Sequence, residues 1–255
     1  MLRTERLPID HLLDLTRTHS VDDRRWNFVT DEMREFANAD ETGPPSLHDY
    51  DNEALALIEA CRDGWVADIG AGNKGRNRDN VINVEITAYP STDIVAIGEA
   101  LPFKDNSLDG IISSAVLEHI KHPWLAAEEI KRVVKPGGRI FIAAPFMVPE
   151  HGYPHHFFNM TRQGLASLFD DKFEITRHYI PDSMVPSWTL HWYLAWWAEG
   201  TLSPEAKEAF LNTRIGDIIQ SDPNKILGEP WGRLNETKTW ELASGTIIHG
   251  IKKSS

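Results

Sequence analysis

Apolar positions in the middle of the chain alternate between short continuous runs and longer amphipathic stretches. Short apolar runs bounded by turn residues predict six strands, at residues 66–69, 81–85, 93–97, 108–113, 139–144 and 173–179. A helix is expected to begin at Pro123, because apolar residues recur along one face from Ala126 to Val134. This alternation of strands and helices predicts an α/β fold with a doubly wound, mostly parallel sheet.

A glycine turn follows the first predicted strand. Gly70, Ala71 and Gly72 come directly after it, and glycine allows the backbone to adopt positive φ and to approach a ligand closely. The spacing also matches the fingerprint of dinucleotide-binding proteins, so the turn alone leaves the ligand open. Only about ten residues separate Gly70 from Val81, which is short for a parallel crossover with a helix. A loop or a very short helix is therefore expected there.

Charged residues surround this turn. Glu85 ends the second predicted strand, where a carboxylate can accept hydrogen bonds from both hydroxyls of a ribose. Lys74, Arg76 and Arg78 crowd the loop between the two strands. They can attract a carboxylate or phosphate, but a solvated basic loop is the preferred interpretation.

The flanking segments are less regular. Residues 1–63 are expected to form a helical extension with a loop at 41–51, and residues 181–242 a helical, tryptophan-rich insert. Helices are also expected after Thr161, as an N-cap, and after Ser203. Trp188, Trp192 and Trp196 share a helix face, which fits core packing, a lid over the ligand or a homodimer contact.

Composition narrows the class of protein. The chain has 255 residues, 41% hydrophobic residues and a formal charge of −12, which suits a globular protein and disfavours nucleic acid as a partner. The single cysteine, Cys61, cannot form an intramolecular disulfide. No apolar run approaches membrane-spanning length and no signal-peptide pattern is present, so a cytoplasmic protein is expected.

Four motifs in order carry a family resemblance. They are VADIGAG at 66–72, the acid Glu85, EALPFKDNSLDGIISSAVLEHI at 99–120 and EIKRVVKPGGRIFIAAP at 129–145. Over roughly residues 64–180 the chain resembles the class I S-adenosylmethionine-dependent methyltransferases, in the small-molecule group called type 11. The resemblance implies a seven-stranded Rossmann-like sheet with its cofactor-binding core at 64–180 and an antiparallel last strand within 243–255. It also implies S-adenosyl-L-methionine as the cofactor. No clear linker interrupts the sequence, so one domain over 1–255 is expected.

The resemblance assigns cofactor-binding residues at matching positions. The methionine part of the cofactor is expected near Asp68, Gly70, Ala71 and Gly72, the ribose at Glu85, the adenine along Gly98 and Glu99, and the floor at Ser114 and Leu117. Many relatives carry an aspartate where this chain has Ile97. Adenine recognition is therefore expected to rest on backbone groups or on Glu99.

Histidines supply the candidate chemistry. His119 lies just after the fourth predicted strand and is interpreted either as a base that orients or deprotonates the acceptor or as a structural residue. His151, Tyr153, His155 and His156 follow the fifth strand and are expected to contact a polar acceptor. No metal is expected, because this loop lacks helical ligand spacing and paired acids.

Two functions remain open at this point. The leading hypothesis is methyl transfer to an oxygen of a small polar acceptor. The run from His151 to Thr161 resembles methyltransferases of sugar and glycan pathways, so a sugar, a glycan precursor or another metabolite is expected. The alternative is a protein of the same fold that acts as an inactive scaffold or regulatory subunit.

Overall fold

The computed structural model describes residues 1–38, 46–47, 49–152 and 155–248. Contacts divide the chain into two compact units. The first comprises Met1–Phe146 and Gly152–His178, and the second comprises Met147–His151 and Tyr179–Ser255. A single domain over residues 1–255 stays a prediction.

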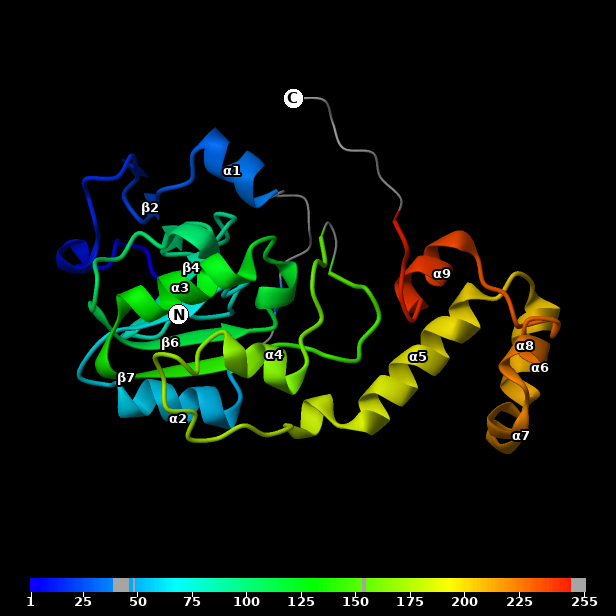
Figure 1. The fold of residues 1–255 in the computed structure, drawn as a ribbon. Coiled ribbons are helices and arrows are strands. Elements are labelled where there is room, and N and C mark those ends of the chain that lie inside the picture. Colours follow the sequence, from blue (N-terminus) through cyan, green and yellow to red (C-terminus); the bar gives the residue numbers. More distant parts are fainter. Residues whose placement is uncertain (39–45, 48, 153–154, 249–255) are drawn as a thin grey trace, which may run out of the picture. The chain divides into compact units, whose positions relative to one another are not determined.

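The first unit is built around a seven-stranded sheet (Figure 1). Its strands are β1 (Ser20–Val21), β2 (Trp26–Asn27), β3 (Val66–Ile69), β4 (Val81–Glu85), β5 (Ile94–Val95), β6 (Leu108–Ser114) and β7 (Val134–Ala143). The spatial order is β1-β2-β5-β4-β3-β6-β7, and all pairings are parallel except that of β1 with β2. Because the order reverses at β3, the carboxyl ends of β3 and β6 form the switch point where such sheets bind ligands.

Helices cover both faces of this sheet (Figure 1). The unit contains α1 (Asp31–Ala37), α2 (Asn52–Ala60), α3 (Pro123–Val133) and α4 (Arg162–Ser167), with 3₁₀ turns η1 (Asp10–Leu12), η2 (Gly98–Ala100) and η3 (Leu117–His119). Side chains alternate across a strand, so Val66 packs in a cluster with Leu57 of α2 while Ala67 packs in the main cluster with Ile130 of α3. The central strands β3 and β4 are therefore buried on both faces.

Local sequence patterns predicted most of these helices and loops correctly. The helix expected from Pro123 forms with Pro123 in its first turn, and the Thr161 hydroxyl caps α4 by accepting a hydrogen bond from the Gly164 amide at 3.0 Å. Residues 70–80 contain no helix, which confirms the loop expected between the first two central strands. The predicted fold class, a doubly wound and mostly parallel seven-stranded sheet with one antiparallel strand, is confirmed.

The antiparallel strand comes from a different part of the chain than expected. It is β1, in the N-terminal segment that was expected to be helical, and β2 beside it pairs with β5 through Trp26 and Ile94. Of the predicted last strand, residues 243–248 are not in a strand, with Ile247 and Ile248 almost fully exposed, and residues 249–253 lie outside the described residues.

The strand predicted at residues 173–179 is also absent. These residues, all described, form an irregular segment whose positions 174–179 are exposed. Phe173 instead packs against Phe169, with ring centroids 6.4 Å apart. The alternating pattern there does not lead to pairing because its apolar side chains have no buried face to join.

The second unit is helical. It contains η4 (Asp182–Met184), α5 (Pro186–Gly200), α6 (Pro204–Asn212), α7 (Ile215–Gln220), α8 (Pro223–Ile226) and α9 (Glu236–Leu242). Its core joins Ala198, Phe210 and Trp231, and the indole N–H of Trp197 donates to the Trp231 carbonyl at 3.0 Å. Among the described residues, no helix is both long and apolar enough to cross a membrane.

The tryptophan-rich helix forms as predicted, but the tryptophans of its predicted face differ in their surroundings. Trp188 is exposed, whereas the Lys238 ammonium lies 3.6 Å from the centroid of the Trp196 ring. The core contact comes from Trp197, which is outside the predicted stripe. Lid and homodimer roles for this helix stay predictions.

The strand β2, which lies between β1 and β5, is predicted to contribute to the stability of the first unit. Trp26 is 1% exposed, so Trp26→Ala is expected to lower the free energy of unfolding by about 3 to 5 kcal/mol in chemical denaturation. The control Trp124→Ala removes a ring that is 49% exposed and is expected to cost less than about 1 kcal/mol. Equal losses in the two variants would contradict a structural role for β2.

Candidate active site

The glycine turn after β3 is sterically restricted to glycine at two positions. Gly70 and Gly72 have φ of +65° and +66°. A Cβ on Gly70 would lie 2.5 Å from a Val116 methyl, and one on Gly72 would lie 2.5 Å from the Ser46 carbonyl oxygen. The Ala71 amide donates to the Val84 carbonyl at 3.1 Å, which ties the turn to β4. Both positions require glycine because Val116 and Ser46 approach the backbone closely at the end of β3.

Glu85 is bound to the same turn. Its Oε2 accepts a hydrogen bond from the Gly72 amide and its Oε1 one from the Ile86 amide, both at 2.8 Å. Burial raises the pKa of this carboxyl, and the amide donors partly offset the effect. Each carboxylate oxygen carries a second lone pair. Glu85 therefore keeps acceptor capacity for hydroxyl groups while it holds the turn.

Asp68 on β3 is buried and paired. It accepts a hydrogen bond from the Tyr50 hydroxyl at 2.7 Å, and the Lys74 ammonium lies 3.6 Å from its Oδ2. Burial raises the pKa of Asp68, while Lys74 and Tyr50 lower it. The loop before α2 thus reaches the predicted cofactor site through Tyr50.

The basic loop is only partly solvated, which corrects the preferred sequence interpretation. The Lys74 side chain is 12% exposed and lies over the Tyr50 ring, 4.5 Å from its centroid. Arg78 also lies over this ring, at 5.4 Å, whereas Arg76 is mostly exposed. Lys74 is directed inward because the buried Asp68 carboxylate needs a positive neighbour.

The predicted adenine side contains an unpartnered acceptor. Gly98 and Glu99 lie in η2, and Ile97 packs in the protein interior. Burial raises the pKa of Glu99, and its Oε1 is buried without a hydrogen-bond partner within the described ranges. Such an oxygen fits an amino-group donor from a ligand.

The two residues predicted to form the floor of the cofactor site differ in burial. Ser114 is exposed at the end of β6, whereas Leu117 has no exposed surface and belongs to the main core cluster. Ser114 is therefore accessible to a ligand, and Leu117 supports the site from the core. Their cofactor-binding roles stay predictions.

His119 is held between two segments. It ends η3, and its Nδ1–H donates to the His155 carbonyl at 2.7 Å. The loop that carries His155 is fixed in turn, because the Phe157 amide donates to the Glu118 carbonyl at 2.7 Å. At Gly152, with φ of +69°, a Cβ would lie 2.4 Å from the His119 ring. The ring is therefore positioned by backbone on both sides.

The histidines predicted to contact an acceptor are divided between the units. His155 accepts a hydrogen bond from the Asn38 amide group at 2.7 Å, and the His156 ring meets the His119 ring edge-on at 5.4 Å. His151 belongs to the second unit, where its Nδ1–H donates to the Pro149 carbonyl at 2.8 Å and its ring lies 5.0 Å from Trp192. Tyr153 lies outside the described residues. The first unit thus brings His155 and His156 to His119.

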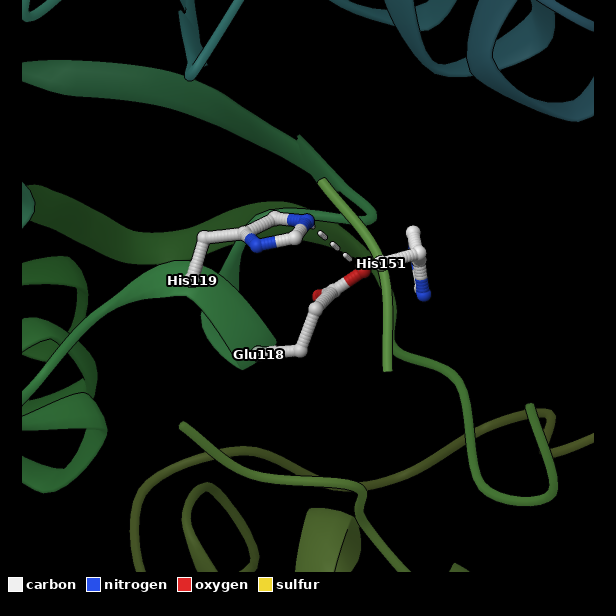
Figure 2. Close-up of side chains that lie close together, drawn as sticks. All are labelled: Glu118, His119 and His151. Atoms are coloured by element: carbon white, nitrogen blue, oxygen red, sulfur yellow. Dashed lines mark ion pairs between the residues drawn. The ribbon is translucent and has the colours of Figure 1, made fainter. Parts of the chain in front are cut away.

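The sequence analysis did not predict Glu118 as a site residue. This residue is 0% exposed, and neither carboxyl oxygen has a hydrogen-bond partner in the part of the chain that the structure describes. Its Oε1 lies 3.8 Å from Nε2 of His119 (Figure 2). Burial raises the pKa of the Glu118 carboxyl to about 7. The only sequence signal was its place directly before His119 in the LEH motif, which says nothing about burial.

The comparisons with known proteins agree with this geometry. Residues 52–142 match the family model described as "Methyltransferase domain". That segment holds β3, β4 and β6, the glycine turn and His119. This segment belongs to the class I S-adenosylmethionine-dependent methyltransferases.

Curated relatives match the methyltransferase domain over part of their length. The chain is 35% identical over 99 residues to an "Uncharacterized methyltransferase" of Mycobacterium tuberculosis (strain ATCC 25177 / H37Ra), covering 35% of this chain and 39% of that protein. It is 42% identical over 72 residues to an "Uncharacterized methyltransferase" of Mycobacteroides abscessus, covering 26% and 28%. The chain thus matches well under half the length of these relatives.

Solved structures with related folds include a putative methyltransferase of Bacillus halodurans and the [4+2]-cyclase SpnF. The first has a TM-score of 0.39 and 16% identity and covers 70% of this chain and 88% of that chain. The second has a TM-score of 0.41 and 17% identity and covers 75% and 79%.

S-adenosylmethionine is the cofactor of the methyltransferase domain. The residues at the switch point fit it in two respects. The turn at Gly70 and Gly72 ends β3 at the switch point, and the Glu99 oxygen, buried without a hydrogen-bond partner within the described residues, offers an acceptor. Glu85 adds acceptor capacity where the ribose is expected. Acceptors are thus available at the positions predicted for the ribose and the adenine.

Glu118 is predicted to make stability depend on pH. Its pKa is about 7 in the folded chain against about 4.5 when unfolded, so the folded chain binds this proton more tightly. The resulting stabilisation is complete below about pH 4.5 and is lost as the pH rises through about 7, by up to about 3 kcal/mol. Glu118→Gln cannot lose this proton, so its stability relative to the original chain is expected to increase over that pH range.

Denaturant titrations at several pH values would measure this difference. The control is Glu128→Gln, which removes an exposed carboxylate from α3 and is expected to show no such trend. A Glu118→Gln curve parallel to that of the original chain at every pH would contradict the assignment.

Proposed function

We propose that this chain transfers the methyl group of S-adenosylmethionine to a hydroxyl oxygen of a small polar metabolite, such as a sugar or glycan precursor. The observation that carries the proposal is the fixed orientation of His119, whose Nδ1–H donates to the His155 carbonyl at 2.7 Å. A ring held in this way carries its proton on Nδ1 when neutral, so that Nε2 has the basic lone pair.

His119 is the proposed general base. The cofactor supplies, when bound, a methyl carbon activated by a positive sulfur, which keeps the electron pair of the broken bond. The hydroxyl of the acceptor must lose a proton as its oxygen forms the new bond, and Nε2 of His119 accepts it. A positioned base of this kind contributes roughly 10² to 10⁴ in rate.

The surroundings of His119 support a polar acceptor. His155, His156 and Asn38 bring imidazole and amide groups to the same loop, and the His156 ring N–H donates to Asn159 at 2.9 Å. Such groups can donate to and accept from hydroxyls. The charge of −12 supports a small molecule over a nucleic acid as the acceptor.

Alignment and exclusion of water supply the remainder of the rate in this proposal. A displacement at carbon needs the reacting atoms about 3 to 3.5 Å apart and in line. The glycine turn and Glu85 fix the cofactor side, and the loop from His155 to Phe158 fixes the acceptor side. The Ala71 amide bonds the turn to β4, and the Phe157 amide bonds the loop to the Glu118 carbonyl of η3.

Cofactor binding is predicted to depend on the switch-point acids. Calorimetric titration with S-adenosylhomocysteine is expected to show binding, and at about 100 times the Kd the ligand should add roughly 2.7 kcal/mol to stability. Glu85→Ala and Glu99→Gln are each expected to weaken binding by about tenfold or more, since each removes hydrogen bonds to the ligand. NAD is the control ligand.

Binding of NAD in place of S-adenosylhomocysteine would contradict the cofactor assignment. Absence of binding by either ligand would favour the alternative of an inactive scaffold. Unchanged affinity in both variants would mean that the cofactor is held by other residues.

Replacing His119 is predicted to lower turnover without changing cofactor binding. His119→Gln is expected to retain S-adenosylhomocysteine affinity but to lose about 10² to 10⁴ in methyl transfer, because the base is removed while the cofactor site is intact. The measurement is formation of S-adenosylhomocysteine in an acceptor screen that begins with sugars. The control His178→Gln lies outside the site. Full turnover by His119→Gln would rule out the base role.

A further inference from the structure

Glu118 is a buried acid that the proposed reaction does not yet use. Its side chain is fully buried, and within the described residues neither oxygen accepts a hydrogen bond. Burying a carboxyl in this way is costly, and such groups need an explanation. The Glu118 backbone already anchors the loop, since its carbonyl accepts the Phe157 and Phe158 amides. The side chain is not needed for that contact.

The geometry directs this acid to His119. Oε1 of Glu118 lies 3.8 Å from Nε2, while Nδ1 on the opposite side of the ring is bonded to the His155 carbonyl (Figure 2). The protonated ring would therefore face an oxygen at each nitrogen. A distance of 3.8 Å is longer than a hydrogen bond but well within the range of attraction between opposite charges, which weak solvation strengthens.

We propose that Glu118 is the positioning residue of His119, and that its carboxylate compensates the positive charge that the ring gains when Nε2 takes a proton. The inference rests on the proposed function for the base role of His119. The proton moves from the acceptor hydroxyl to Nε2 and is later released to solvent, so Glu118 itself need not exchange it.

The other titratable neighbours in the first unit do not supply this charge. His156 approaches the His119 ring edge-on at 5.4 Å, and the His155 ring is engaged with Asn38. Both can only be neutral or positive, so neither compensates a cation. Burial raises the pKa of Glu118 to about 7 and so disfavours its charge, whereas a positive charge on the adjacent ring favours its ionisation. A purely structural role would require only the shape of the side chain, which glutamine also provides.

The test is an NMR titration of the full chain labelled with ¹⁵N-histidine. S-adenosylhomocysteine is present to fix the cofactor site, and EDTA removes divalent cations. The His119 ring signals are assigned by their absence in His119→Gln. In Glu118→Gln the pH midpoint of these signals is expected to fall by about one unit or more, because an opposite charge within 4 to 6 Å has been removed.

Two variants make the result specific. Glu128→Gln makes the same change at an exposed acid of α3, outside the site, and is expected to leave the His119 midpoint unchanged. Glu118→Asp retains the charge at a different distance from the ring. Its His119 midpoint is expected to lie between those of the original chain and Glu118→Gln. It also carries the test if Glu118→Gln does not fold.

An unchanged His119 midpoint in Glu118→Gln, or an equal shift in Glu128→Gln, would overturn the positioning role. Because the midpoint needs no acceptor and no turnover, this failure is distinct from failure of the proposed function. The latter would appear as full methyl transfer by His119→Gln.

Discussion

The site depends on one steric constraint, the left-handed turn at the end of β3. Gly70 packs against Val116, which follows β6, and Gly72 packs against the backbone at Ser46, so the turn closes on two neighbouring segments. The Gly72 amide is also bonded to the Glu85 carboxylate. One short backbone segment thereby fixes the ends of β3, β4 and β6 relative to each other. The residues proposed to bind the cofactor lie at these strand ends.

Two buried acids near this turn illustrate opposite solutions to the same electrostatic problem. Asp68 is accompanied by Tyr50 and Lys74, so its charge is compensated before any ligand arrives. Glu118 has only the His119 ring beside its Oε1 as an ion-pair partner within the described residues. The first arrangement stabilises a charged site at rest. The second is suited to a charge that appears only when the neighbouring ring is protonated.

Local sequence patterns predicted the features that local chemistry determines. The strand before Gly70, the loop that replaces the first helix, and the caps at Thr161 and Ser203 all follow from neighbouring residues. Burial and long-range pairing were not readable in the same way. The two-residue strand at Trp26 has no periodicity, and the inward direction of Lys74 depends on Asp68 across the loop. The burial of Glu118 is likewise a property of the folded chain, in which the loop from His155 lies against it.

The pairing of β2 with β5 also has a consequence for synthesis of the chain. β2 leaves the ribosome before its parallel partner around Ile94, which follows only after β3 and β4. Trp26 and Phe28, both almost fully buried in the finished fold, have no sheet edge to join during that interval. Until β5 has been made, β2 has only β1 to pair with, and its large apolar side chains stay accessible. In this condition nascent chains associate with chaperones or with each other.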